Sequence, residues 1–225
     1  MRLKSRLLHA VTFVIATKVM RRAPGGQPPN WAGRLCWSMV SSQAPFAPGH
    51  LELVRKFVNT RDLEKGTDEL LESSDWDAWC QSQELPTGSA RDDRERLQGL
   101  REALRVGMLA NHDRAAPPTP MLDALNAALA WSEACPVATS KGLDLQPAGD
   151  GASYVAGLLV RTVAQALTDG SWSRMKACGD DTCQWAFYDH SRSRSGLWCS
   201  MDICGNRNKQ MRWRKRQARE PRSDG

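Results

Sequence analysis

The 225-residue sequence lacks the short motifs by which many enzymes are recognised. It has no glycine-rich phosphate loop, no His-Glu-x-x-His and no Gly-x-Ser-x-Gly nucleophile elbow. Its four histidines, His9, His50, His112 and His190, are far apart in the chain and form no cluster by spacing. An enzyme hidden in the middle of the chain is therefore the least favoured interpretation, and we predict no catalytic residue.

The sequence also lacks an apolar run long enough to cross a bilayer. The basic start MRLKSR precedes the apolar stretch LLHAVTFVIATKVM, which is shorter than the roughly 20 residues of a spanning helix. Arginines follow this stretch where a signal peptide would have small residues. We predict no membrane role and a bacterial-type cytoplasmic location. We take residues 1–45 as an unstructured or mis-assigned N-terminal extension, with Met39 as a candidate start.

Acidic residues are absent from the first 45 positions, and the charge of the remainder is uneven. Residues 46–170 hold 12 basic and 19 acidic residues, whereas residues 171–225 hold 12 basic and six acidic ones. An acidic body with a basic end indicates that this end meets a polyanion and that the body faces away from it. The alternative is a solvated tail that aids solubility.

Hydrophobic periodicity predicts a mostly helical domain over residues 46–170. Leucines and methionines recur at helical spacing in residues 91–113, and residues 152–170 form an apolar helix that Gly170 can end. Thr119 is predicted to cap a helix that continues to about Trp131.

The shorter segments of this domain are less regular. Residues 50–60 fit either a strand or a short amphipathic helix, and residues 134–149 fit a hairpin. Residues 66–81 are predicted to form one helical turn, a break at Ser73-Ser74 and a helix with buried tryptophans. The fold class is thus mainly α with a few short strands (α+β), followed by a small C-terminal module that holds four clustered cysteines and by a basic helix.

Four of the seven cysteines lie within 27 residues, in two pairs of the same spacing. They are Cys178, Cys183, Cys199 and Cys204. Each pair can supply two thiolates from one turn, which suits one structural Zn²⁺ with no open coordination position. A pair of disulfides, an iron–sulfur cluster, or His190 in place of one cysteine are the alternatives. A segment this short cannot bury enough apolar surface alone, so an aromatic layer of Trp185, Phe187, Tyr188 and Trp198 is expected against the metal.

The run CGDDTCQWAFYDHSRSRSGLWCSMDICGNR resembles the CGNR zinc finger. Upstream, LELVRKFVNTRDLEKGTDELL resembles the start of the ABATE domain, which precedes that finger; together the resemblance covers about residues 46–218. It implies a stress-related transcription regulator that binds zinc through the same four cysteines and also binds DNA. The domain plan is then residues 46–170 as an ABATE-like domain and residues 171–220 as the finger with its basic helix.

The segment after Cys204 is rich in cations, and no residue from 206 to 220 breaks a helix. A duplex backbone would relieve the repulsion along this helix. Met211 and Trp213 are expected to dock the helix onto the finger, with base stacking as the alternative. Arg207 is expected to donate to a carbonyl or to Asp189. The candidate nucleic-acid contacts are Arg192, Arg194, Arg207, Lys209, Arg212, Arg214, Lys215 and Arg216.

These observations favour a zinc-dependent DNA-binding transcription regulator, which would associate with the nucleoid when bound. Its helical domain would sense a signal or dimerise, because a single finger seldom gives enough specificity alone. The alternative is a zinc-stabilised module that binds protein or RNA without reading a DNA sequence.

Overall fold

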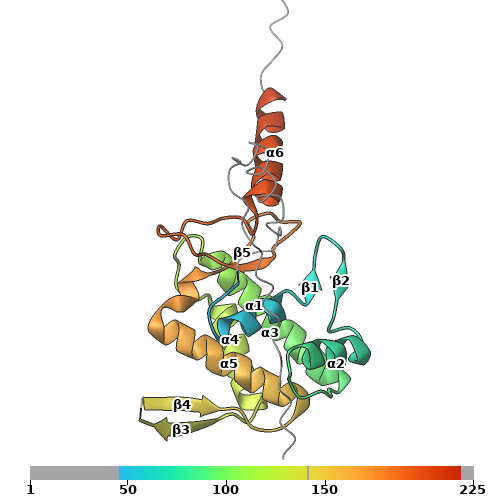
Figure 1. The fold of residues 1–225 in the computed structure, drawn as a ribbon, viewed down its shortest axis with the longest axis vertical. Coiled ribbons are helices and arrows are strands. Elements are labelled where there is room, and N and C mark those ends of the chain that lie inside the picture. The colour runs from blue at the N-terminus through green and yellow to red at the C-terminus, as the bar shows by residue number, and fades with distance from the viewer. Residues whose placement is uncertain (1–45, 141, 219–225) are drawn as a thin grey trace, which may run out of the picture. The chain divides into compact units, whose positions relative to one another are not determined.

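The computed structural model describes residues 46–140 and 142–218, which form helices, short hairpins and a C-terminal module (Figure 1). The expected N-terminal extension and the last cations, Arg219 and Arg222, lie outside the described residues. Among the described residues no helix has the length and apolarity needed to cross a bilayer.

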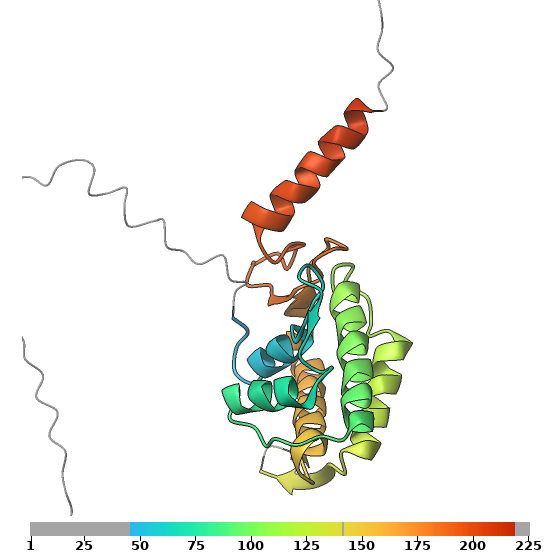
Figure 2. The ribbon, with the colours of Figure 1, turned by 90° about the vertical axis from the view of Figure 1, so that its right-hand side faces the viewer.

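Four helices form the body of the protein: α1 (Leu51–Val58), α3 (Arg91–Ala110), α4 (Thr119–Trp131) and α5 (Gly151–Asp169). Helix α3 packs against α4, and α5 packs against α1 and α4 (Figures 1 and 2). The apolar positions of α3 and α5 that recur at helical spacing are buried in this core, as predicted. Gly170 ends α5 in the left-handed region, with φ of 77°. Residues 50–60, which fitted a strand or a helix, contain α1. The mostly helical fold class is confirmed.

The segment before α2 (Ser73–Ser82) differs from the prediction. In place of a helical turn, β2 (Thr67–Asp68) pairs with β1 (Arg61–Asp62) in a hairpin. The Asp62 carboxylate accepts the amides of the two residues that follow Leu63 and so closes the turn. The predicted break at Ser73-Ser74 is the start of α2, whose Trp76 and Trp79 rings stack at 5.3 Å in the core.

The predicted hairpin of residues 134–149 is present. Strand β3 (Cys135–Thr139) pairs antiparallel with β4 (Gly142–Gln146), and Asp144 of β4 binds the guanidinium of Arg161 on α5. The predicted cap of α4 is displaced by one residue: Pro118 is the N-cap, and Thr119 is already helical. Pro120 explains why the helix starts here. Proline has no N–H, and an N–H in the first turn would have no partner within the helix.

The C-terminal module shares the core of the helical body. Strands β5 (Met175–Ala177) and β6 (Ala186–Tyr188) pair antiparallel after the short helix η1 (Ser171–Arg174). Met175, Ala177, Ala186 and Tyr188 are buried in the same cluster as the helices. This contact supplies the apolar burial that the module could not find alone. The division of the chain at residue 170 stays a prediction.

Polar side chains fix the module to the helices. The Asn59 amide, just after α1, donates to the Ala186 carbonyl at 3.0 Å and accepts the Ala186 N–H at 2.7 Å. Arg105 of α3 donates to the carbonyl of Gln184 at 2.7 Å. These bonds satisfy main-chain groups of Ala186 in β6 and of Gln184 just before it. They therefore set the position of the module on the body.

Candidate metal centre and basic helix

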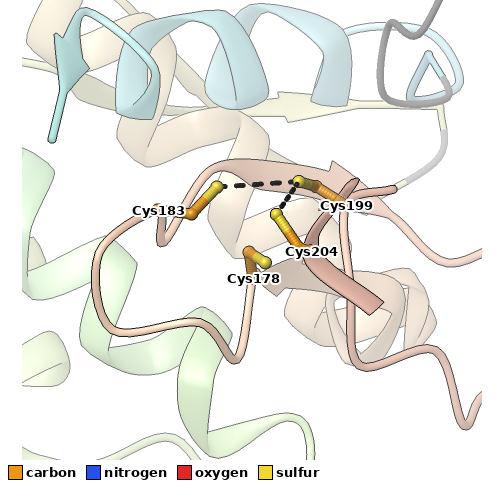
Figure 3. A group of neighbouring side chains, drawn as sticks. All are labelled: Cys178, Cys183, Cys199 and Cys204. Carbon is orange, nitrogen blue, oxygen red and sulfur yellow. Dashed lines mark hydrogen bonds between the residues drawn. The ribbon is translucent and has the colours of Figure 1, made fainter. Parts of the chain in front are cut away.

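The four clustered cysteines come from two turns that face each other (Figure 3). Cys178 follows β5 and Cys183 precedes β6, so the β5–β6 hairpin holds the first pair. Cys199 comes from the loop after β6, and Cys204 lies in η2 (Met201–Gly205), directly before α6 (Asn206–Gln217). The fold thus brings together all four cysteines that the sequence selected.

The sulfur positions fit one tetrahedral zinc ion. All four Sγ atoms lie within 4.8 Å of one another, and Cys199 Sγ is 3.7 Å from Cys183 Sγ and 3.7 Å from Cys204 Sγ. Zinc–sulfur bonds of about 2.3 Å in a tetrahedron place the sulfurs about 3.8 Å apart. The four cysteines are free thiols, far beyond disulfide distance. His190 instead contacts the carbonyl of Phe46.

The charge balance of the cluster also fits a dication. Hydrogen bonds from the thiols of Cys183 and Cys199 lower the pKa of Cys178, the direction that favours a thiolate ligand. Burial, together with the charges of the neighbouring Cys178 and Cys183 thiolates, raises the pKa of Cys204 to about 12. Four thiolates this close repel one another unless a cation balances them. The donor set, the spacing and the charge therefore agree on zinc.

Each turn is closed by its own hydrogen bonds. In the first turn the Asp180 carbonyl accepts the Cys183 amide at 2.9 Å, and its carboxylate accepts the Thr182 hydroxyl at 2.7 Å. In the second turn the Ser200 carbonyl accepts the Cys204 amide at 3.0 Å. These hydrogen bonds hold each turn in the shape that presents its cysteines.

Glycine at two positions of the centre makes room for one tryptophan ring. A Cβ added to Gly179 would lie 3.3 Å from the Trp198 ring, and one added to Gly205 would lie 3.2 Å from it. Trp198 and Trp185 pack against the cysteines, as expected. Phe187 is buried but is not part of this layer. Tyr188, which was expected in this layer, belongs instead to the main core because its strand faces the helices.

The loop of residues 190–197 is anchored by a buried ion pair. Lys176 Nζ donates to Asp189 Oδ2 at 2.9 Å and to the carbonyls of Arg194 and Gly196 at 2.7 Å and 3.1 Å. Both side chains of the pair are at most 3% exposed. Burial raises the pKa of Asp189, but hydrogen bonds from Ser191, Lys176 and Gly196 outweigh it and hold the pKa below its ordinary value.

Helix α6 begins at the metal centre, as predicted, and its cations face solvent. Five of them are exposed and have no ion pair or hydrogen bond within the described residues: Lys209, Arg212, Arg214, Lys215 and Arg216. The prediction that Met211 and Trp213 dock this helix is wrong, because their side chains are 43% and 56% exposed. The apolar residues are too few to form a buried stripe on a helix that is charged all round.

Arg207 is the cation of α6 that has carboxylate partners. It binds Glu64 of the β1–β2 turn at 2.6 Å and lies 3.5 Å from Asp180. Hydrogen bonding to Glu64 raises the pKa of Arg207. The expected contact with Asp189 is wrong, because Lys176 occupies that carboxylate. Of the other predicted contacts, Arg192 and Arg194 lie in the exposed loop of residues 190–197.

The fold and the centre define a class: a helical domain joined to a four-cysteine zinc finger with a basic helix. Comparison with protein families agrees. Residues 174–217 match the CGNR zinc finger, and residues 51–170 match ABATE, described as "Putative stress-induced transcription regulator". The chain belongs to the ABATE family and carries one CGNR zinc finger, a site for one zinc ion. No curated protein matches the chain.

Sequence reasoning missed the residues that hold the finger in place. Asn59, Arg105 and Lys176 act through partners that are distant in the chain. The resemblance to the ABATE domain includes the Phe57–Thr60 run, and this run contains Asn59. Only the fold shows that Asn59 binds the main chain of Ala186. Lys176 gave a weaker signal, as a lysine between the apolar neighbours Met175 and Ala177.

Proposed function

We propose that the protein is a zinc-dependent DNA-binding transcription regulator, in which Cys178, Cys183, Cys199 and Cys204 bind one structural zinc. Lys209, Arg212, Arg214, Lys215 and Arg216 then contact the phosphate backbone. The observation that carries the proposal is the exposure of these five unpaired cations on α6. A helix with this charge cannot be buried in a core. Binding to a polyanion is favourable for it, because the counterions condensed on the polyanion are released.

The metal centre supports this role by fixing where the helix starts. Cys204 is a candidate ligand and is 1% exposed, and α6 begins two residues later. The ion pair of Arg207 with Glu64 adds a second tie between α6 and the helical body. Binding of zinc therefore orients α6 with respect to the body, in addition to stabilising the turn.

The salt dependence of binding to a duplex tests the proposal. With four to six phosphates contacted, the logarithm of the affinity falls with the logarithm of the salt concentration at a slope of about −4 to −5. The variant Arg214→Gln/Arg216→Gln should flatten this slope by about 2. The control Arg91→Gln/Arg96→Gln loses the same charge at the start of α3 and should leave it unchanged. Binding that does not depend on salt, or equal effects of the two variants, would refute the proposal.

The second candidate is a module that binds a protein partner, and exposed apolar side chains favour it. Met201, Ile203, Met211 and Trp213 are all more than 40% exposed on η2 and α6. They could contact a partner or a second copy of the chain in a homodimer. A preference for one duplex sequence over another that persists at high salt favours the regulator, and its absence favours the second candidate.

A further inference from the structure

A cleft of about 460 Å³ lies on the side of the finger formed by the loop of residues 190–197. The end of α3 and the residues after it form one wall, and η1 and the 190–197 loop form the other. Its lining is Asn111, Arg114, Ala115, Ser173, Arg192, Ser193 and Arg194. Three of these residues are arginines and none is acidic.

The three arginines have no carboxylate partner in the described part of the chain. Arg114 donates to the Ser193 carbonyl at 2.9 Å, Arg194 donates to the Ser173 hydroxyl at 3.3 Å, and Arg192 makes no side-chain hydrogen bond there. Since each guanidinium has five N–H donors, most donors in the cleft are free. The buried arginines Arg101 and Arg105, by contrast, bind carboxylates.

The walls of the cleft are held in place by contacts of the body. Asn111 donates to the carbonyls of Trp172 and Met175 at 2.8 Å and 2.7 Å, which joins the end of α3 to η1 and β5. Lys176 donates hydrogen bonds to the carbonyls of Arg194 and Gly196 and so fixes the 190–197 loop. The backbone that carries the arginines is therefore in place before any ligand arrives, which lowers the entropic cost of binding.

Three guanidinium groups without a counterion form a site for a tetrahedral oxyanion, because each fork can donate two parallel bonds to phosphate oxygens. We propose that Arg114, Arg192 and Arg194 bind a phosphate group, and that in the DNA complex this group is a backbone phosphate. The segment between β6 and η2, which includes the 190–197 loop of this cleft, lies at the end of the body from which α6 extends (Figures 1 and 2). This inference rests on the proposed function, and it adds Arg114, on the acidic body that was expected to face away from DNA, to the DNA-binding surface.

Arg114→Gln tests the site, with Arg91→Gln as the matched control. Arg91 begins α3 and Arg114 follows its end, so the two variants lose the same charge about 30 Å apart. Affinity of the full chain for a duplex of random sequence is measured from 50 to 300 mM salt by fluorescence anisotropy. Arg114→Gln should lower the affinity about eightfold at 0.1 M salt and flatten the slope by about 0.9, whereas Arg91→Gln should change neither.

A second variant and a second probe make the outcomes separable. Arg192→Gln breaks no contact of the described residues, so it should fold normally and give the same loss as Arg114→Gln. Binding of inorganic pyrophosphate is measured by calorimetry with the same proteins. Unchanged duplex affinity with loss of pyrophosphate binding would assign the cleft to a free phosphate compound. No effect on either probe would overturn the site, while the α6 variants would still test the proposed function by themselves.

Discussion

Replacement of Lys176 by methionine tests whether the buried ion pair holds the finger loop. Methionine has a similar length and no charge, so it fills the space of the lysine stem. The Asp189 side chain, 3% exposed, would lose its cation, and the carbonyls of Arg194 and Gly196 would lose their donor. The substitution thus leaves an uncompensated charge and unsatisfied acceptors in the interior.

Breaking a buried pair by removal of one partner costs about 3–5 kcal/mol. This is a large part of the roughly 5–15 kcal/mol by which a domain of this size is stable. Urea unfolding of the zinc-saturated, reduced protein, followed by tryptophan fluorescence, measures the change. The control Lys209→Met removes the same charge from an exposed site of α6 and should change the free energy of unfolding by no more than about 0.5 kcal/mol. A loss below about 1 kcal/mol for Lys176→Met would refute the reasoning.

Three further predictions concern the contact between finger and body, the buried Asp189 and the free thiols. Asn59→Ala removes both hydrogen bonds to Ala186 and should lower the free energy of unfolding by about 2–3 kcal/mol in the same urea assay. Because the pKa of Asp189 is lowered in the folded state, its ionised form stabilises the protein above its ordinary pKa of 3.8, and this contribution is lost as the pH falls below that value. Asp189→Asn should therefore make the unfolding free energy less dependent on pH between about 5 and 3, and an unchanged profile would contradict this. Burial raises the pKa of Cys80 to about 12, so in the folded protein iodoacetamide at pH 8 should alkylate the exposed Cys135 and spare Cys80, as peptide mass spectrometry can determine.

The elements with a regular pattern were predictable from the sequence. Helices α3 and α5 follow from apolar residues at helical spacing, and Gly170 marks the end of α5. The hairpin β1–β2 was not predictable, because strands of two residues have no period to detect. Its turn depends on Asp62, whose carboxylate could equally have capped a helix.

The metal centre was predictable from two cysteine pairs of equal spacing, whereas its surroundings were not. The pairing of Arg207 with Glu64 spans 143 residues, and that of Asn59 with Ala186 spans 127. Such contacts depend on the tertiary fold and leave no local pattern. The docking of Met211 and Trp213 failed for a related reason: a hydrophobic side chain predicts burial only when a neighbouring surface is there to cover it.

The most direct test of the account measures zinc and duplex binding together in the full chain, with Cys199→Ser and the control Cys135→Ser. Cys199 is one of the four clustered thiols, whereas Cys135 is exposed on β3. The account predicts one zinc per chain in the wild type and in the control, and loss of both zinc and duplex binding in Cys199→Ser. A wild-type chain without zinc, or duplex binding that survives Cys199→Ser unchanged, would contradict it.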